Sequence, residues 1–393
     1  KNESANNEDT ISIGISVVDK NIALDEFKPS LRVVKRVLTD SGKYEYQSSD
    51  VALGSAITSQ NSDGETVYEY KVDNLDDDGY YSMSCVATDY ANHKVSNILS
   101  EDGSGQYSPV GEVDFSVNRD GSVFWIETEH NDKYTDKEYT DELNGKYAND
   151  KVKVTIHEVN VDKVDESDEQ RTKFTLNDGS SSESVELEEG DNGSGNYRKN
   201  QLIGEGGWYE NTYTLDNTNF DHDGKYSVDI VTYDKANNSN LNSKDETGTI
   251  SFILDTTDPV ITSNAKSGQR AKKVEYPVEF VVSDANLDES TLKVSLNGEE
   301  IEPEAAGDNR YKFTVANGLN QNFEITANDL AGNKAEIYKA DRFTVSTNVL
   351  LLWYANTALF WGSIGGVVAV IGGISAILIL RRRKKLKLLE SEE

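Results

Sequence analysis

A repeated motif is the feature that most constrains the fold of this 393-residue chain. The segment at 76–92 reads DDDGYYSMSCVATDYAN, and the segment at 221–237 reads DHDGKYSVDIVTYDKAN, so the two align without a gap. A third segment, at 321–333, reads QNFEITANDLAGN; it keeps the alternation and the Asp-x-Ala element but lacks Asp-Gly-x-Tyr. Because each copy of a repeat is one structural unit, three copies predict three domains of one kind.

The residues around each copy alternate as β-strands do. Runs in which apolar residues recur at every second position follow the copies, as in VDFSVN at 113–118 and ISFILD at 250–255. This period is that of a half-buried strand. No stretch before residue 349 has a helical period. Many short strands bounded by Gly, Asn and Asp, in units of roughly 100 residues, predict an all-β protein made of β-sandwiches.

The Asp-Gly-x-Tyr element resembles the E–F corner of immunoglobulin-like (Ig-like) domains. In that corner a tyrosine at the start of strand F donates a hydrogen bond to the backbone upstream of it. The resemblance assigns this role to Tyr81 and Tyr226, and it places Asp78 and Asp223 in the turn before each tyrosine.

The chain departs from the disulfide-bearing Ig-like domains. The second cysteine of those domains lies two residues beyond the tyrosine, where this chain has Met83 and Val228. Its single cysteine, Cys85, cannot form an internal disulfide. Cys85 lies on the same strand face as Tyr81 and Met83 by the period of two, and we interpret it as a small buried hydrophobic residue.

The Asp-x-Ala-(Gly)-Asn element predicts a hairpin turn after strand F, because Asn and Gly tolerate positive φ. Together with LDTTDPVI at 254–261 and SDANLDES at 283–290, it is similar to the tandem Ig-like repeats of bacterial surface proteins. The resemblance covers residues 10–348 and implies the fold, not a ligand. No Leu-Pro-x-Thr-Gly motif precedes the apolar C-terminal segment, which leaves that segment as the expected anchor.

Domain boundaries follow from aligning NRDGSVF at Asn118 with DTTDPVI at Asp255, each directly after a last strand. The middle domain is then the longest, and its additional residues, 129–150 and 177–200, are polar segments expected to be exposed loops. The predicted order is three Ig-like β-sandwiches, one transmembrane helix and one basic tail, over residues 1–118, 119–257, 258–348, 349–380 and 381–393.

The segment from Val349 to Leu380 has no charged side chain and is long enough for a bilayer-spanning helix. Aromatic residues suited to the membrane interface precede it, and basic residues follow it, at Trp353, Tyr354, Trp361, Arg381, Arg382 and Arg383. The positive-inside rule places the tail in the cytoplasm and residues 1–348 outside the cell. Small residues at Gly362, Gly366, Ala369 and Gly373 would let two such helices approach closely.

Charge and composition exclude several classes of function. The net charge of the chain is −31, and the last 13 residues contribute six basic and three acidic side chains. An acidic chain repels phosphate backbones, so no nucleic-acid partner is expected. The four histidines, His93, His130, His157 and His222, have no spacing that a metal site or a catalytic triad requires, so we predict no catalytic residues, no cofactor and no metal site.

Two motifs leave alternatives open. The carboxylates of DDDG and DHDG are ligands that Ca²⁺ accepts, although a solvated turn that precedes the tyrosine corner is favoured. GEGGWYEN, at 204–211, places Trp208 and Tyr209 among glycines, as in a sugar-stacking platform, although the start of a strand with one ring in the core is favoured.

The sequence predicts a non-enzymatic, single-pass bacterial surface protein with an Ig-like stalk or adhesive ectodomain. Its expected partners are the lipid bilayer and an extracellular protein or glycan. The alternative is the accessory region of a surface enzyme that processes carbohydrate or peptide, with its catalytic domain N-terminal to this chain. A signalling receptor is disfavoured because thirteen cytoplasmic residues cannot fold into a domain.

Overall fold

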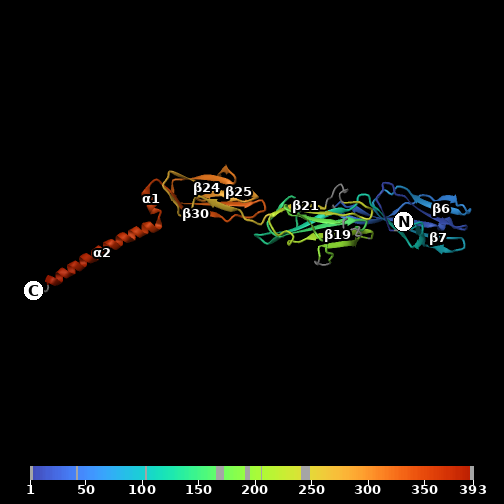
Figure 1. Cartoon of the computed structure of the whole chain (residues 1–393), viewed down its shortest axis with the longest axis horizontal. Helices are drawn as coiled ribbons and strands as arrows, with labels where there is room; N and C mark the ends of the chain where they lie inside the picture. The colour runs from blue at the N-terminus through green and yellow to red at the C-terminus, as the bar shows by residue number, and fades with distance from the viewer. Residues whose placement is uncertain are drawn as a thin grey trace. The chain divides into compact units, whose positions relative to one another are not determined.

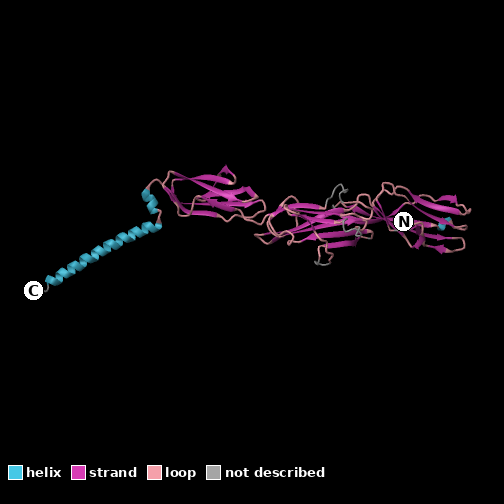
Figure 2. Cartoon of the chain, viewed as in Figure 1, coloured by secondary structure: helices cyan, strands magenta, loops and turns pink. Residues whose placement is uncertain are grey.

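The computed structural model describes residues 3–40, 43–101, 104–164, 172–190, 195–204, 206–239 and 248–389. The described residues form β-strands up to residue 345 and two helices after it (Figure 2). The predicted fold class, an all-β protein with Ig-like sandwiches and one long apolar C-terminal helix, is confirmed. The chain divides into two compact units, Lys1–Leu254 and Asp255–Glu393 (Figure 1). The predicted domain boundaries near 118 and 257 stay predictions.

The first sandwich lies at the N-terminal end of the first unit. One sheet has the order β1 (Ser4–Asn6), β11 (Val113–Val117), β7 (Gly79–Thr88), β3 (Lys28–Leu38) and β4 (Tyr44–Val51), with β8 (Lys94–Val95) beside β7. The facing sheet has the order β2 (Ile13–Val18), β6 (Thr66–Val72) and β5 (Ile57–Gln60). A hairpin of β9 (Ile98–Glu101) and β10 (Tyr107–Val110) and a short 3-10 helix (Leu24–Glu26) complete it.

The second sandwich has the same strand order in one of its two sheets, the sheet equivalent to the one that contains β1. One sheet contains β14 (Tyr147–Ala148), β21 (Thr249–Leu254), β20 (Gly224–Val231), β16 (Lys173–Asn177) and β17 (Ser182–Ser184). The other contains β13 (Lys137–Tyr139), β12 (Val123–Asp132), β15 (Val152–Asn160), β19 (Trp208–Leu215) and β18 (Tyr197–Ile203).

The third sandwich repeats this order in the second unit. One sheet contains β23 (Arg270–Ala271), β30 (Tyr338–Val345), β29 (Gly318–Asp329), β25 (Leu287–Leu296) and β26 (Glu299–Ile301). The other contains β22 (Val260–Ser263), β24 (Glu275–Ser283), β28 (Arg310–Ala316) and β27 (Glu304–Gly307). In each sandwich a short strand pairs in parallel with the last strand, as β1 does with β11, β14 with β21 and β23 with β30.

Inward-facing residues at every second position fill the space between the sheets. β20 alternates between buried and partly exposed residues and places Tyr226, Val228 and Ile230 in the core. Val228 therefore occupies the interior without a disulfide, as the sequence predicts, and Met83 of β7 is buried in the same way. Cys85 follows Met83 on the same face and is half-buried, and burial raises the pKa of its thiol to about 11.

The two polar segments of the middle sandwich are not simply exposed loops. Leu143 and Ala148 are buried in the core, and residues 147–148 form β14. In the second segment, Tyr197 is buried and Val185 packs against the core; β17 lies within this segment and β18 begins in it. The expectation of exposed loops was wrong because a few apolar residues spaced along a polar segment are enough to hold it on a sheet.

The first two sandwiches share a buried contact inside the first unit. Trp208 of β19 is 6% exposed, and its Nε1 donates a hydrogen bond to the Val34 carbonyl of β3 over 2.9 Å. Val34, Val159, Val161 and Trp208 form one buried apolar cluster. The sugar-platform alternative for Trp208 is therefore wrong, because the ring is covered by protein and its N–H is already paired.

A glycine explains the close approach at this contact. Gly207 precedes Trp208 with φ 77°, and a Cβ added there would lie 2.0 Å from the Tyr80 ring of the first sandwich. Only a residue without a side chain fits both the positive φ and the space. Gly207, and Gly204 beside Tyr46 of the first sandwich, thus allow the close contact between sandwiches.

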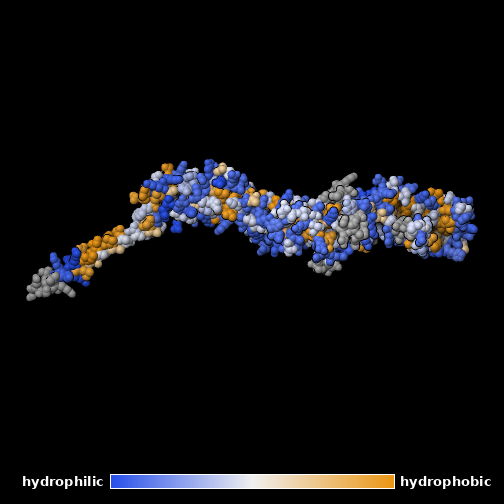
Figure 3. Space-filling view, in the orientation of Figure 1, coloured by the Kyte–Doolittle hydropathy of each residue, from blue (hydrophilic) through white to orange (hydrophobic). Residues whose placement is uncertain are grey.

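The uncharged C-terminal segment, predicted as one membrane segment from residue 349, begins with a separate short helix. α1 spans Val349–Tyr354 and α2 spans Thr357–Leu389. The side chains of Asn348 and Asn356 accept hydrogen bonds from Leu350 N (2.9 Å) and Leu359 N (3.2 Å), which caps each helix at its N-terminus. Residues Thr357–Lys385 of α2 are long and apolar enough to cross a membrane. Figure 3 shows apolar surface along α2 that changes to hydrophilic surface toward its C-terminal end.

We expect Trp208→Ala to uncouple the first two sandwiches. The substitution removes a buried indole and its hydrogen bond, and it should cost about 3 to 5 kcal/mol of coupling free energy. Calorimetry of the chain should change from one joint transition for these sandwiches to two separate ones. Trp125→Ala, at a half-exposed tryptophan of the second sandwich, is the control. Unchanged coupling in Trp208→Ala would contradict this assignment.

Candidate functional site

The two predicted corner tyrosines lie at equivalent places in the first two sandwiches. The Tyr81 hydroxyl donates to the Asp77 carbonyl over 2.8 Å, and the Tyr226 hydroxyl donates to the His222 carbonyl over 2.8 Å. Both rings are at most 2% exposed. Burial raises the pKa of Tyr81 to about 12, and burial also raises the pKa of Tyr226. This geometry is that of a tyrosine corner with a structural role.

The two aspartates of the corner have different surroundings. The Asp78 carboxylate accepts hydrogen bonds from Arg119 N (2.8 Å) and Arg119 Nη1 (2.9 Å). It therefore joins the corner of the first sandwich to the segment that leads into the second, and a guanidinium already neutralises it. Asp223 lies in the turn before β20, close to His222, whose pKa is raised mainly by its hydrogen bond to Asp221.

The Asp-x-Ala element forms the turn that follows β7, β20 and β29, as predicted. Asn92 (φ 71°), Asn237 (φ 69°) and Gly332 (φ 88°) have the positive φ that the turn requires. In each turn the aspartate side chain accepts the backbone N–H four residues later: Asp89 from His93 (2.8 Å), Asp234 from Asn238 (2.9 Å) and Asp329 from Asn333 (2.7 Å).

These hairpins also bind the segment that enters each sandwich. In the second sandwich, Asn238 Nδ2 donates to the Asn118 carbonyl over 2.7 Å. In the third, Asn333 Nδ2 donates to the Asp255 carbonyl over 2.6 Å. Asn118 and Asp255 are therefore equivalent residues, as the alignment that set the predicted boundaries implies.

Asn118 completes a buried cage of oxygen atoms in the second sandwich. Its Nδ2 donates to Asn160 Oδ1 (2.8 Å), Asp162 Oδ2 (3.0 Å) and Asp234 Oδ2 (2.8 Å). Burial raises the pKa of Asp162 to about 6. The side-chain amide of Asn118 thus lies between the carboxylates of Asp162 and Asp234.

The equivalent place in the third sandwich has three carboxylates. Oxygen atoms of Asp255, Asp284 and Asp329 all lie within 4.8 Å of one another, and Asp255 and Asp329 are buried. Asn286 Nδ2 donates to Asp255 Oδ2 over 2.6 Å. Burial raises the pKa of Asp329, and the charges of Asp255 and Asp284 act in the same direction. Carboxylate oxygens are hard-cation ligands, but a Ca²⁺ site needs six to eight oxygens, and these residues supply three carboxylates.

Sequence reasoning missed this cluster, although the signal was present. Asp255 was used only to set a boundary, Asp284 only as part of a resemblance and Asp329 only as a turn residue. Aligning the second and third repeats over their full length, rather than over the corner alone, places these aspartates opposite Asn118, Asn160 and Asp234.

A second buried polar group lies in the core of the middle sandwich. Glu158 of β15 is fully buried and accepts hydrogen bonds from the side chains of Ser122, Thr232, Tyr213 (2.7 Å) and Asn211 (3.3 Å). Burial raises the pKa of this carboxyl group. Four donors from strands of both sheets and from the entering segment surround one acceptor, so Glu158 links the sheets and has no exposed face for a substrate.

The four histidines do not come together as an active site would require. His93 lies 2.8 Å from Asp89, His157 lies 2.8 Å from Glu210 and stacks on Trp125, and His130 stacks on Tyr139. None of these pairs brings in a nucleophilic serine or cysteine among the interactions of the described residues.

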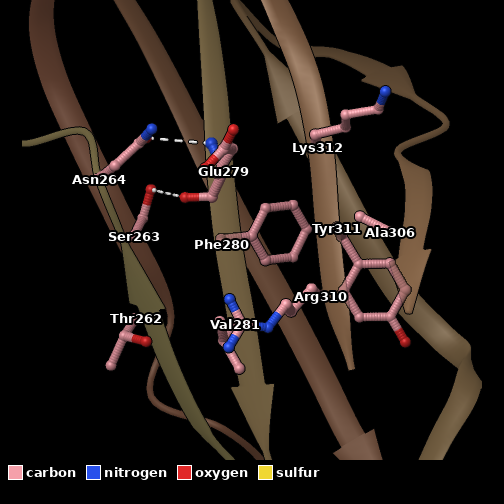
Figure 4. A pocket seen from close by; sticks show the side chains of 10 residues that line it. All are labelled: Thr262, Ser263, Asn264, Glu279, Phe280, Val281, Ala306, Arg310, Tyr311 and Lys312. Carbon is pink, nitrogen blue, oxygen red and sulfur yellow. Dashed lines mark hydrogen bonds between the residues drawn. The ribbon is translucent and has the colours of Figure 1, made fainter. Parts of the chain in front are cut away.

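A groove of the third sandwich lies on β22, β24, β27 and β28 and has a volume of about 390 Å³. Figure 4 shows the Ser263 hydroxyl donating to the Glu279 carbonyl (3.1 Å) and Asn264 accepting from Glu279 N (3.0 Å). Charged side chains line the groove, but Lys312 is already paired with Glu304 over 2.9 Å. No histidine or cysteine is among the described residues that line it.

Comparisons with known proteins identify no family for the chain. No family model matches the chain, and no curated protein matches it. Among solved structures, the chain is similar to the I9–I11 tandem of titin, at 10% identity over 88% of this chain and 95% of that one, with a TM-score of 0.25. It is also similar to the fibronectin(III)-like modules of Clostridium thermocellum CbhA, at 12% identity over 52% and 90%, with a TM-score of 0.23.

We expect Tyr81→Phe and Tyr226→Phe each to destabilise their own sandwich by about 1 to 3 kcal/mol, because a backbone carbonyl loses its partner. Tyr→Ala at either position should cost more, about 3 to 5 kcal/mol, because it also leaves a cavity. Denaturant unfolding measures both. Tyr90→Phe, at an exposed tyrosine of the first sandwich, is the control and should change nothing. Equal stability of wild type and both Tyr→Phe variants would contradict the corner role.

We expect Asp255→Asn to stabilise the third sandwich by about 1 kcal/mol at pH 7, because an amide donates where three carboxylates repel. The pKa of Asp329 is higher in the folded protein than in the unfolded chain. The wild type therefore loses stability as pH rises from the unfolded-state pKa of Asp329 through its folded-state pKa. The stabilisation of the third sandwich by Asp255→Asn should therefore shrink as pH is lowered toward 4.

Thermal melts with chelator and with added Ca²⁺ check this prediction, with exposed Glu302→Gln as the control. A melting temperature that rises with Ca²⁺ in the wild type alone, together with destabilisation by Asp255→Asn, would identify the cluster as a cation site instead.

Proposed function

We propose that the chain is a membrane-anchored bacterial surface protein whose Ig-like ectodomain acts as a non-enzymatic stalk or adhesive region. The observation that carries this proposal is the apolar span Thr357–Lys385, which follows the Ig-like sandwiches and is not covered by protein. The five basic residues at 381–385 favour a cytoplasmic C-terminus.

The strand pairing suits a protein under tension between its ends. Each sandwich has, near its N-terminal end in sequence, a short strand that pairs in parallel with its last strand, as in Arg270 with Thr344 and Ala271 with Val345. When the chain is pulled at both ends, two parallel strands are loaded in shear, so that all hydrogen bonds between them resist together. This arrangement supports a positional role.

The buried carboxylates also support a structural role. Glu158 is enclosed by four donors, and Asp78 and Asp234 hold the segment that joins the first two sandwiches. Each of these groups stabilises a junction or a core. The small-residue positions of α2, with open space around Gly362 and Gly366, support the further proposal that two anchors associate in the bilayer.

We expect protease added to intact cells to release the ectodomain while an epitope placed after Glu393 stays protected. Antibody labelling before and after permeabilisation measures this topology. An epitope placed before Lys1 is the control and should be accessible from outside. Labelling of the C-terminal epitope on intact cells would reverse the proposed orientation, and release of the whole chain by alkaline carbonate would contradict the anchor.

A further inference from the structure

The segment 264–274 of the third sandwich runs along the last strand, from Gly268, whose N donates to the Asp341 carbonyl over 2.7 Å, to the end from which the chain leaves for the helices. β23 pairs in parallel with the end of β30, with Ala271 opposite Val345, and Ser346 N donates to the Ala271 carbonyl over 3.0 Å. Because the two strands run in the same direction, residues 272–274 emerge beside residues 346–348. Arg270 Nη2 lies 3.5 Å from the Ala355 carbonyl at the break between α1 and α2.

This loop is basic in an acidic chain. Residues 264–274 contain four basic and no acidic side chains, namely Lys266, Arg270, Lys272 and Lys273. All four are exposed, and none forms a salt bridge in the part of the chain that the structure describes. Other lysines of the same sandwich pair with carboxylates: Lys293 with Glu300, Lys312 with Glu304 and Lys339 with Glu324.

Exposed apolar side chains lie next to these cations. Val274 is 72% exposed at the end of the loop, and Leu350 of α1 is 72% exposed. No residue of α1 is buried. Trp353 and Tyr354 contact Phe360 of α2 edge to face, which continues the aromatic cluster into the start of the membrane span. Water is an unfavourable environment for this surface, whereas the membrane interface accepts apolar and aromatic side chains.

We propose that the loop at 264–274 and α1 together form a docking surface for anionic phospholipids. α1 lies in the headgroup layer, and the four basic side chains contact lipid phosphates. Basic residues beside a membrane segment attract an anionic leaflet within about one Debye length. This proposal rests on the membrane anchor proposed above and adds that the third sandwich is held at the bilayer surface rather than free to swing about its anchor.

The test uses the full chain in lipid nanodiscs. One set contains neutral phosphatidylcholine alone, and the other contains about half phosphatidylglycerol. Hydrogen exchange should be slower for residues 264–274 and for α1 in the anionic discs, by ~10-fold or more if the loop binds headgroups. Salt at about 1 M should remove most of this difference because it screens the cations.

The variant carries Lys266→Gln, Arg270→Gln, Lys272→Gln and Lys273→Gln and should lose the lipid dependence. A matched control carries Lys293→Gln, Lys312→Gln, Lys334→Gln and Lys339→Gln in the same sandwich and should keep it, although its charge change is identical. Leu350→Ser should restore fast exchange in α1 with less effect on the loop.

The outcomes separate this proposal from the anchor. A chain that fails to enter discs and is extracted from vesicles by alkaline carbonate would overturn the anchor. A chain that inserts but shows equal exchange at 264–274 in both lipids would overturn the docking surface alone. Protection by soluble inorganic polyphosphate without protection by phosphatidylglycerol would also overturn it, because the loop would then bind free polyanions.

Discussion

Burial of apolar side chains between two sheets is the interaction on which the rest of the structure depends. The chain has one cysteine, so its sandwiches fold without disulfides. Met83 and Val228 are buried at the positions where related domains have a cysteine, and the corner tyrosines lie beside them. The apolar cores stabilise the sandwiches. The ends of each sandwich, where its strands begin and end, are therefore available for polar contacts with the neighbouring segment of the chain.

The same arrangement of polar contacts occurs in the second and third sandwiches, but with different side chains. The hairpin after the Asp-x-Ala element binds the entering segment through Asn238 in the second sandwich and Asn333 in the third. The entering residue is an amide at Asn118 and a carboxylate at Asp255. In the second sandwich the polar groups around Asn118 are paired by internal hydrogen bonds, whereas in the third sandwich the carboxylates around Asp255 concentrate negative charge. Two copies of one repeat therefore have different electrostatic properties.

Charge is also distributed unevenly along the chain. The ectodomain is strongly acidic, yet the loop at 264–274 has four basic side chains that form no salt bridge with the described residues. The anchor and this loop are about 75 residues apart in sequence and meet because β23 pairs with the last strand before α1.

The fold class was predictable from local patterns. Alternation of period two determines which face of a strand is buried, and the uncharged length at the C-terminus determines a helix long and apolar enough to cross a membrane, because both depend on neighbouring residues. The positive φ of Asn92 and Asn237 followed from residue type in the same way.

Tertiary structure alone decided the rest. The contact of Trp208 with Val34, the cage around Asn118 and the meeting of Asp255, Asp284 and Asp329 join residues that are far apart in sequence. Periodicity cannot determine which strands end at the same end of a sandwich, because this depends on the order of strands in the sheets. It also cannot determine how closely two sandwiches approach, because this depends on the space left by residues such as Gly207.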